Sequence, residues 1–119
     1  MAGDPSAFVL MDSFADEGIF VSVISYMEVL EGALRFGDRA ESEAHVRIAI
    51  GNIPVLEVSP GVARECAFVR SALRRAGRRV NPRALDLLIA ATAIAHDLTL
   101  VTRNVHDYRD VAGLQLFEP

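Results

Sequence analysis

Four side chains whose oxygen atoms can bind a cation lie near the ends of apolar segments in this 119-residue sequence. They are Glu28, Asp86, Asn104 and Asp107. Asp86 is the most unusual of them because its neighbours Leu85, Leu87 and Leu88 are apolar. Burying an ionised carboxylate costs free energy unless a partner compensates its charge. Since the set contains no Cys or His, a shared cation would be bound by oxygen alone, which favours Mg²⁺ or Mn²⁺.

The spacing around Asp86 predicts where its partners lie. Only two residues separate the predicted helix that carries Asp86 from the predicted strand 98–102, so the helix and the strand must run antiparallel. The helix rises roughly 16 Å between Asp86 and Asp97, and the strand rises roughly 20 Å up to Asn104. Asp86 and Asn104 are therefore expected at similar heights.

Asp107 and Glu28 are expected at the same edge of the sheet. Asp107 lies in the loop after strand 98–102 and can fold back toward it, and Glu28 lies one turn into a helix that follows a predicted strand at 19–24. Ligands of open α/β sheets collect at the carboxyl ends of the strands. Carboxylates that converge there repel one another unless a cation lies among them.

Each of these residues also has a purely structural interpretation. Glu28 can complete a capping box with Ser25, and Asp86 can interact with the positive end of its helix dipole. Asp107 can be an ordinary turn residue, and Asn104 can hydrogen-bond within its own loop. The convergence of all four at one edge favours a shared cation.

Alternating helices and strands position these residues. We expect strands at 19–24, 54–58, 98–102 and 114–117, and helices at 5–17, 25–36, 39–50, 60–76 and from Asn81-Pro82 to about 95. Proline after Asp, Ser or Asn marks three of the helix starts. Such alternation predicts an α/β sandwich with a mostly parallel sheet. The length fits one domain over residues 1–119.

The charge distribution indicates one surface for an anionic partner. The net charge is −4, yet all twelve cationic side chains are arginines and six of them fall within residues 70–83. Clustered guanidinium groups suit phosphate contacts, although a solvated helix face has the same composition. The residues assigned to phosphate contact are Arg74, Arg75, Arg78, Arg79, Arg83 and Arg103.

Several classes of function are excluded. Cys66 is the one cysteine, so it forms neither an internal disulfide nor a thiolate zinc site, and its helical spacing places it in the core. No apolar run approaches the roughly 18 residues of a membrane span, and the first residues do not resemble a signal peptide, so we expect a cytoplasmic protein. The glycines lack dinucleotide-binding spacing, and a phosphoacceptor receiver domain would contain a lysine.

Three segments carry a resemblance to a known family: VSVISYMEVLEGA (21–33), ALDLLIAATAIAH (84–96) and LTLVTRNVHDY (98–108). They resemble the PIN domain, and most closely the VapC ribonuclease toxins of bacterial toxin–antitoxin pairs. The resemblance covers roughly residues 5–119. It implies a PIN-like three-layer α/β/α sandwich and a metal-dependent endoribonuclease that cuts RNA and is held inactive by a VapB-like antitoxin. It also implies a homodimer.

The resemblance assigns roles to the acidic residues. Glu28 and Asp86 match two members of the family's acidic set, and Asn104 matches a position that is Asp or Asn in such proteins. Thr102 stands just before it, and Asp107 is a further candidate. In the family these groups hold one or two Mg²⁺ or Mn²⁺ ions. Such an ion lowers the pKa of a bound water and neutralises charge on the scissile phosphate.

The N-terminal segment departs from the family pattern. Such toxins begin with an apolar strand, typically LLDTN or LLDTS, which forms the centre of the sheet and supplies the first metal ligand. The segment FVLMDSF (8–14) looks similar and would give Asp12 that role. However, only six residues separate Asp12 from the strand that starts at Ile19, which is fewer than a parallel crossover needs.

The residues of this segment fit a helix over 5–17 better than a strand. The cap Asp4-Pro5 precedes apolar residues at helical spacing, which are Phe8, Met11 and Phe14. We therefore expect an N-terminally incomplete domain without the family's first strand and first Asp, and Asp12 as a solvent-facing helix residue. Upstream residues, a partner or dimer exchange would then complete the sheet, whose edges invite pairing.

Two functions remain open at this stage. A set without the first Asp should hold Mg²⁺ more weakly, so one interpretation is a toxin with impaired ribonuclease activity. The other is a non-catalytic, degenerate PIN-like protein that only binds an antitoxin or another protein partner.

Overall fold

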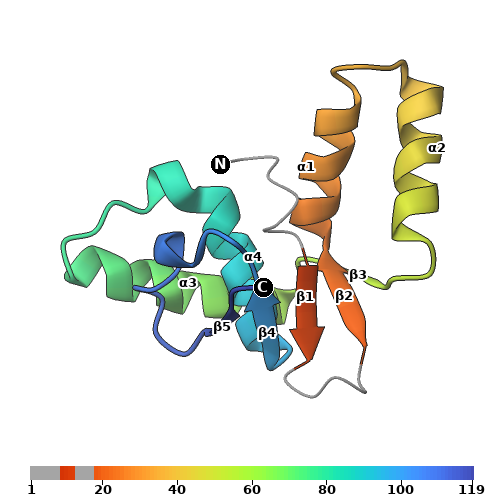
Figure 1. The fold of residues 1–119 in the computed structure, drawn as a ribbon. Helices are drawn as coiled ribbons and strands as arrows, with labels where there is room; N and C mark the ends of the chain where they lie inside the picture. Colours follow the sequence, from red (N-terminus) through yellow and green to blue (C-terminus); the bar gives the residue numbers. More distant parts are fainter. Residues whose placement is uncertain (1–8, 13–17) are drawn as a thin grey trace.

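The computed structural model of the chain describes residues 9–12 and 18–119. The strands are β1 (Val9–Asp12), β2 (Ile19–Ser22), β3 (Val55–Leu56), β4 (Leu98–Val101) and β5 (Gln115–Phe117). The helices are α1 (Val23–Ala33), α2 (Arg39–Ile50), α3 (Pro60–Arg75) and α4 (Ala84–Ala95), with the short 3-10 helices η3 (Asn81–Arg83) and η4 (Val105–Asp107). Figure 1 shows α1 and α2 as a helical pair beyond the ends of β1 and β2, and α3 with α4 beside β4.

The strands form one sheet in the order β3-β2-β1-β4-β5. β2 is parallel to β3 and β4 is parallel to β5, whereas β1 is antiparallel to both β2 and β4. Since β1 opposes both of its neighbours, the other four strands point the same way. The predicted α/β sandwich with a mostly parallel sheet is confirmed.

The predicted helix over 5–17 is wrong where it can be compared, because Val9–Asp12 is a strand at the centre of the sheet. The proposed cap Asp4-Pro5 lies outside the described residues. The short connection to Ile19 excludes a parallel crossover but suits an antiparallel pair, in which Met11 faces Ile19. Asp12 is therefore a strand residue and not a helix residue.

Two predicted helix starts also need correction. α1 begins at Val23 with Ser22 as its N-cap, so Ser25 does not cap it and forms no capping box with Glu28. Asn81 does not cap the helix that carries Asp86, because a 3-10 turn over Asn81–Arg83 precedes α4. By contrast, the predicted helix at 39–50 matches α2, and Ser59 caps α3 as the sequence indicated.

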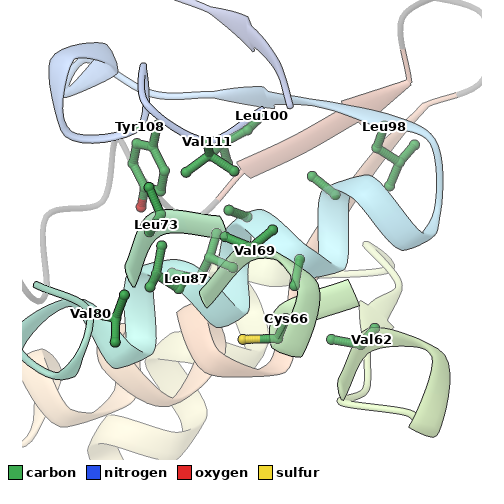
Figure 2. Packing of buried hydrophobic residues seen from close by; sticks show 14 residues of the cluster. Val62, Cys66, Val69, Leu73, Val80, Leu87, Leu98, Leu100, Tyr108 and Val111 are labelled. Atoms are coloured by element: carbon green, nitrogen blue, oxygen red, sulfur yellow. The ribbon is translucent and has the colours of Figure 1, made fainter. Parts of the chain in front are cut away.

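The core lies between α3, α4 and β4. α3 contributes an apolar stripe at helical spacing, made of Val62, Cys66, Val69 and Leu73. This stripe faces α4, where Ala90, Ala91 and Ala93 are fully buried. Small side chains at a contact let helices approach closely, so the alanine-rich sequence of α4 fits its place between α3 and the sheet. Figure 2 shows this packing with Leu98 and Leu100 of β4.

The core also confirms the sequence interpretation of Cys66. Cys66 is buried as predicted, and burial raises the pKa of its thiol, so it has little thiolate character. None of the helices in the described part of the chain has the length and apolar character of a membrane span. The core anchors α4 and therefore fixes the position of Asp86.

Candidate functional site

Glu28 is a buried carboxylate in the second turn of α1. The helix starts at Ser22, whose Oγ accepts a hydrogen bond from the backbone N–H of Ser25 at 3.0 Å. Glu28 is thereby excluded from a capping role and lies where only 7% of its surface is exposed. Its Oε2 atom has no hydrogen-bond partner among the described residues. Burial, followed by repulsion from Asp86 and Glu31, raises the pKa of the Glu28 carboxyl group above its ordinary value.

Asp86 lies in the first turn of α4, where its charge acts on Glu28. α4 and β4 are joined by His96 and Asp97 alone, as predicted, and Asp97 adopts φ 55° to make the turn. The start of α4 therefore lies at the carboxyl end of β4. This short connection explains why Asp86 lies near the loop that follows β4, as the sequence predicted.

Asp86 and Asp107 line one surface pocket of about 350 Å³. The other lining residues are Arg78, Arg83, His106 and Asp110. Asp107 ends the short helix η4, and its Oδ1 lies 3.2 Å from Nε2 of His106. Glu28 does not line this pocket, but it lies close enough to Asp86 for the two charges to repel.

The chain from Thr102 to Asn104 fixes the start of the loop that carries Asp107. Thr102 is fully buried, and its Oγ1 accepts a hydrogen bond from the backbone N–H of Asn104 at 3.0 Å. Asn104 is the residue before η4, and its backbone carbonyl accepts a hydrogen bond from the N–H of Asp107. Asn104 is not among the lining residues of the pocket.

Tyr108 is a buried residue close enough to Asp86 and Glu28 to be affected by their charges, and sequence reasoning missed it. Its side chain is 1% exposed, and its hydroxyl makes no hydrogen bond of good geometry to any described residue. Burial, followed by the nearby charges of Asp86 and Glu28, raises the pKa of Tyr108 far above its ordinary value, so the hydroxyl stays protonated. Tyr108 ends the segment 98–108 that carries the family resemblance, but the sequence assigned it no role.

Asp110 is the second residue that sequence reasoning missed. It accepts two hydrogen bonds from the guanidinium group of Arg83, at 2.9 and 2.7 Å. The Nε atom of Arg78 lies 3.9 Å from the same carboxylate. These arginines lower the pKa of Asp110. The charged segment RNVHDYRD indicated a polar loop but did not distinguish Asp110 from its neighbours.

The remaining arginines assigned to phosphate contact are on the surface. Arg75, Arg79 and Arg103 are exposed. Arg74 is exposed too, but it shares the Asn81 Oδ1 acceptor with Arg70, at 3.3 and 2.8 Å. Two of these arginines, Arg74 and Arg75, border a groove of about 520 Å³ along α3.

The backbone of Asp12 lies at the end of the strands opposite to the acidic pocket. The register pairs Asp12 with Leu98 at the beginning of β4, and Val9 with Val101 at its end. The backbone of Asp12 therefore lies at the amino end of β4, whereas Asp86 and Asp107 lie beyond the carboxyl end. The segment 9–12 therefore supplies a central strand whose Asp12 backbone lies far from Asp86 and Asp107 along β4.

The carboxylates present fit a hydrated divalent cation. Among the described residues, no group of three or more His, Cys, Asp or Glu side chains is close enough to hold a metal ion. Mg²⁺, however, is usually held by one or two carboxylates and keeps several waters. Glu28, with an unpaired buried oxygen, repels Asp86, and a cation between them would reverse this unfavourable interaction.

The amino-acid sequence is similar to known proteins. Residues 2–114 match the family of the PIN domain. The chain is 30% identical over 95 residues to the tRNA(fMet)-specific endonuclease VapC of Shigella flexneri, covering 80% of this chain and 70% of that protein.

Solved structures show the same similarity. DNA-bound VapBC from Salmonella typhimurium matches with a TM-score of 0.72 and 28% identity, over 82% of this chain and 72% of that chain. VapBC-5 from Mycobacterium tuberculosis matches with a TM-score of 0.70 and 26% identity, over 98% of this chain and 95% of that chain. The residues matched by the PIN-domain family, 2–114, include Glu28, Asp86 and Asp107.

Proposed function

Because the chain belongs to the PIN-domain family, and within it to the VapC type, we propose that it is a metal-dependent endoribonuclease toxin that hydrolyses RNA phosphodiester bonds. Nucleases of this type generally depend on a divalent metal. The observation that carries the proposal is the buried Glu28 carboxylate beside Asp86, whose Oε2 atom has no hydrogen-bond partner in the described part of the chain. Two carboxylates close together repel each other, and a cation bound between them would make this arrangement favourable.

Glu28 and Asp86 are the central ligands in this proposal. Asp107, across the same pocket as Asp86, and Asn104 complete the ligand set, directly or through waters. The ion is Mg²⁺ or Mn²⁺, since all four side chains offer oxygen. When bound, the ion supplies an activated water and neutralises charge on the phosphate. The carboxylates would hold the ion at the carboxyl ends of the strands.

The arginines on α3 and after it supply the RNA contacts. Arg78 borders the acidic pocket, and Arg75, Arg79 and Arg103 are exposed. Guanidinium groups bind phosphate oxygens in a bidentate manner, and such contacts are independent of RNA sequence. Arg74 and Arg83 also belong to the basic surface, although both donate hydrogen bonds to other residues of the chain.

We further propose a VapB-like antitoxin as the partner that neutralises the chain, because its structural relatives are VapBC assemblies. A homodimer and a cytoplasmic location complete the proposal. An antitoxin that covers the acidic pocket would exclude RNA from it.

The test is RNA cleavage by the purified full chain. We expect cleavage with Mn²⁺, none with EDTA, and a loss of about 100-fold or more in Asp86→Asn, since outer-shell substitutions alone commonly cost 10–100-fold. Glu43→Gln, which alters an exposed acid of α2, serves as the control and should cleave like the parent chain. Cleavage that survives both EDTA and Asp86→Asn would sink the proposal.

Two observations favour a second function. The backbone of Asp12 lies at the opposite end of the strands, and no metal-binding group of three side chains exists among the described residues. These facts suit a degenerate PIN-like protein that only binds an antitoxin or another partner. A correctly folded chain that binds antitoxin but shows no metal-dependent cleavage would establish this alternative.

A further inference from the structure

Arg83 makes the most extensive side-chain interaction described for the pocket. Its Nη1 donates a hydrogen bond to Asp110 Oδ2 at 2.9 Å, and its Nη2 donates to Asp110 Oδ1 at 2.7 Å. Nη2 also donates to the backbone carbonyl of Asp107 at 2.8 Å. The first two bonds form a bidentate pair, which fixes orientation as well as distance.

The pair joins the two segments that carry the acids of the pocket. Arg83 directly precedes α4, three residues before Asp86, and Asp110 follows Asp107 by three residues. The bond to the Asp107 carbonyl holds the end of η4 directly. The side chains of Arg83 and Asp110 are each only 24% exposed, so water and salt screen this pair less than a fully exposed one.

We propose that Arg83 and Asp110 form a positioning pair that holds η4 against the first turn of α4, so that Asp86 and Asp107 face one divalent cation. This inference rests on the proposed function. In this positioning role neither residue touches the ion. Arg83 acts through the segment that it binds, and Asp110 compensates the charge of Arg83. Arg78, the other arginine of the pocket, has the weaker contact with Asp110, at 3.9 Å.

A purely structural role and a positioning role predict different measurements. A structural pair contributes to the stability of the metal-free chain and leaves metal affinity unchanged. A positioning pair determines metal affinity, because outer-shell partners orient the groups that bind the ion. Mn²⁺ binding therefore has to be measured separately from stability.

The experiment uses the full chain with Asp110→Asn, which keeps the shape of the side chain and removes its charge. Mn²⁺ binding is measured by titration calorimetry, and thermal unfolding is recorded in EDTA and at increasing Mn²⁺. We expect the Kd for Mn²⁺ to rise about 10–100-fold. Arg83→Lys, which keeps the charge but loses the bidentate geometry, should weaken Mn²⁺ binding in the same direction and less strongly.

Glu65→Gln is the matched control, since it breaks the exposed Arg64–Glu65 pair of α3 at 3.2 Å and should leave the Kd unchanged. Parental Mn²⁺ affinity in Asp110→Asn and Arg83→Lys, whatever their melting temperatures in EDTA, would refute the positioning pair alone. If the parent chain itself binds no Mn²⁺ and Asp86→Asn changes nothing, the proposed function fails together with this inference.

Discussion

Glu28 illustrates at the scale of one residue how a fold can prepare a site for a cation. Its carboxyl group is buried, its Oε2 atom has no hydrogen bond to residues 9–12 or 18–119, and Asp86 repels its charge. Each of these effects disfavours the ionised form, and together they raise the pKa. The metal-free chain therefore carries an electrostatic cost at neutral pH that a bound cation would remove.

This cost predicts how stability depends on pH. Since the folded pKa of Glu28 lies above its ordinary value of 4.5, the folded chain holds a proton that the unfolded chain releases in the window between the two values. Stability that is present below pH 4.5 is thus lost as the pH rises through the folded pKa. Glu28→Gln should remove this loss and make the metal-free chain more stable than the parent at neutral pH.

Urea unfolding in EDTA over a series of pH values measures the difference between Glu28→Gln and the parent chain. The difference is the relevant quantity because Asp110, whose pKa Arg83 lowers, gives the parent the opposite trend. Adding Mn²⁺ should reverse the ranking, since the amide is a poorer ligand. A Gln variant with the same pH profile as the parent would contradict the burial of a destabilised carboxylate.

At the residue scale, the sequence predicted the acids whose position follows from a short connection. The two residues between α4 and β4 bring Asp86 to the loop of Asp107, and any fold with that connection would do so. Tyr108 and Asp110 could not be predicted, because their roles depend on side-chain packing and pairing between distant segments. The sequence assigned Arg83 to phosphate contact, which stays a prediction, and it did not reveal the hydrogen bonds between Arg83 and Asp110.

At the scale of an element, α1 shows why one serine can be mistaken for another. Both Ser22 and Ser25 precede helix-forming residues, and Ser25 has Glu28 at the spacing of a capping box. The structure selects Ser22, whose Oγ accepts the backbone N–H of Ser25 and donates to Ser25 Oγ, each at 3.0 Å. The helix starts earlier because β2 ends at Ser22.

Ser22→Ala should therefore destabilise the chain more than Ser25→Ala. The first substitution removes the N-cap and the hydroxyl–hydroxyl bond, and loss of an N-cap costs about 1 kcal/mol, with up to about 2 kcal/mol in some proteins. The second removes only the hydroxyl–hydroxyl bond. Chemical denaturation of both variants in EDTA measures the difference. A larger loss in Ser25→Ala would support the sequence-based assignment of the cap instead.

β1 shows a different reason for failure at the scale of an element. A four-residue strand has too few positions for its period to be distinguished from that of a helix, and apolar residues around Val9–Asp12 also suit a helical face. The count of residues to Ile19 correctly excluded a parallel crossover. An antiparallel pair needs far fewer residues to connect its strands. The connection from Asp12 to Ile19 is long enough for such a pair, which is the one observed.

At the scale of the whole molecule, the centre of the sheet and the site are assembled from distant parts of the chain. β1 comes first in the sequence yet pairs with β4, the fourth strand, along with β2. The acids come from α1, α4 and η4. Pairings over such separations form late, because their loop-closure entropy must be overcome first. Local pattern therefore predicts the elements better than it predicts their partners.

The wide separation of the acids has a consequence during synthesis. On the ribosome, Glu28 emerges long before Asp86, and Asp107 and Asp110 emerge later still. A growing chain that ends at Asn104 lacks both β5 and the segment that Arg83 binds. We expect such a chain to show no Mn²⁺-induced stabilisation and no RNA cleavage, as measured beside the full chain. A cleaving fragment would contradict this, whereas an inert one would mean that RNA cleavage becomes possible only after the segment beyond Asn104 has been synthesised.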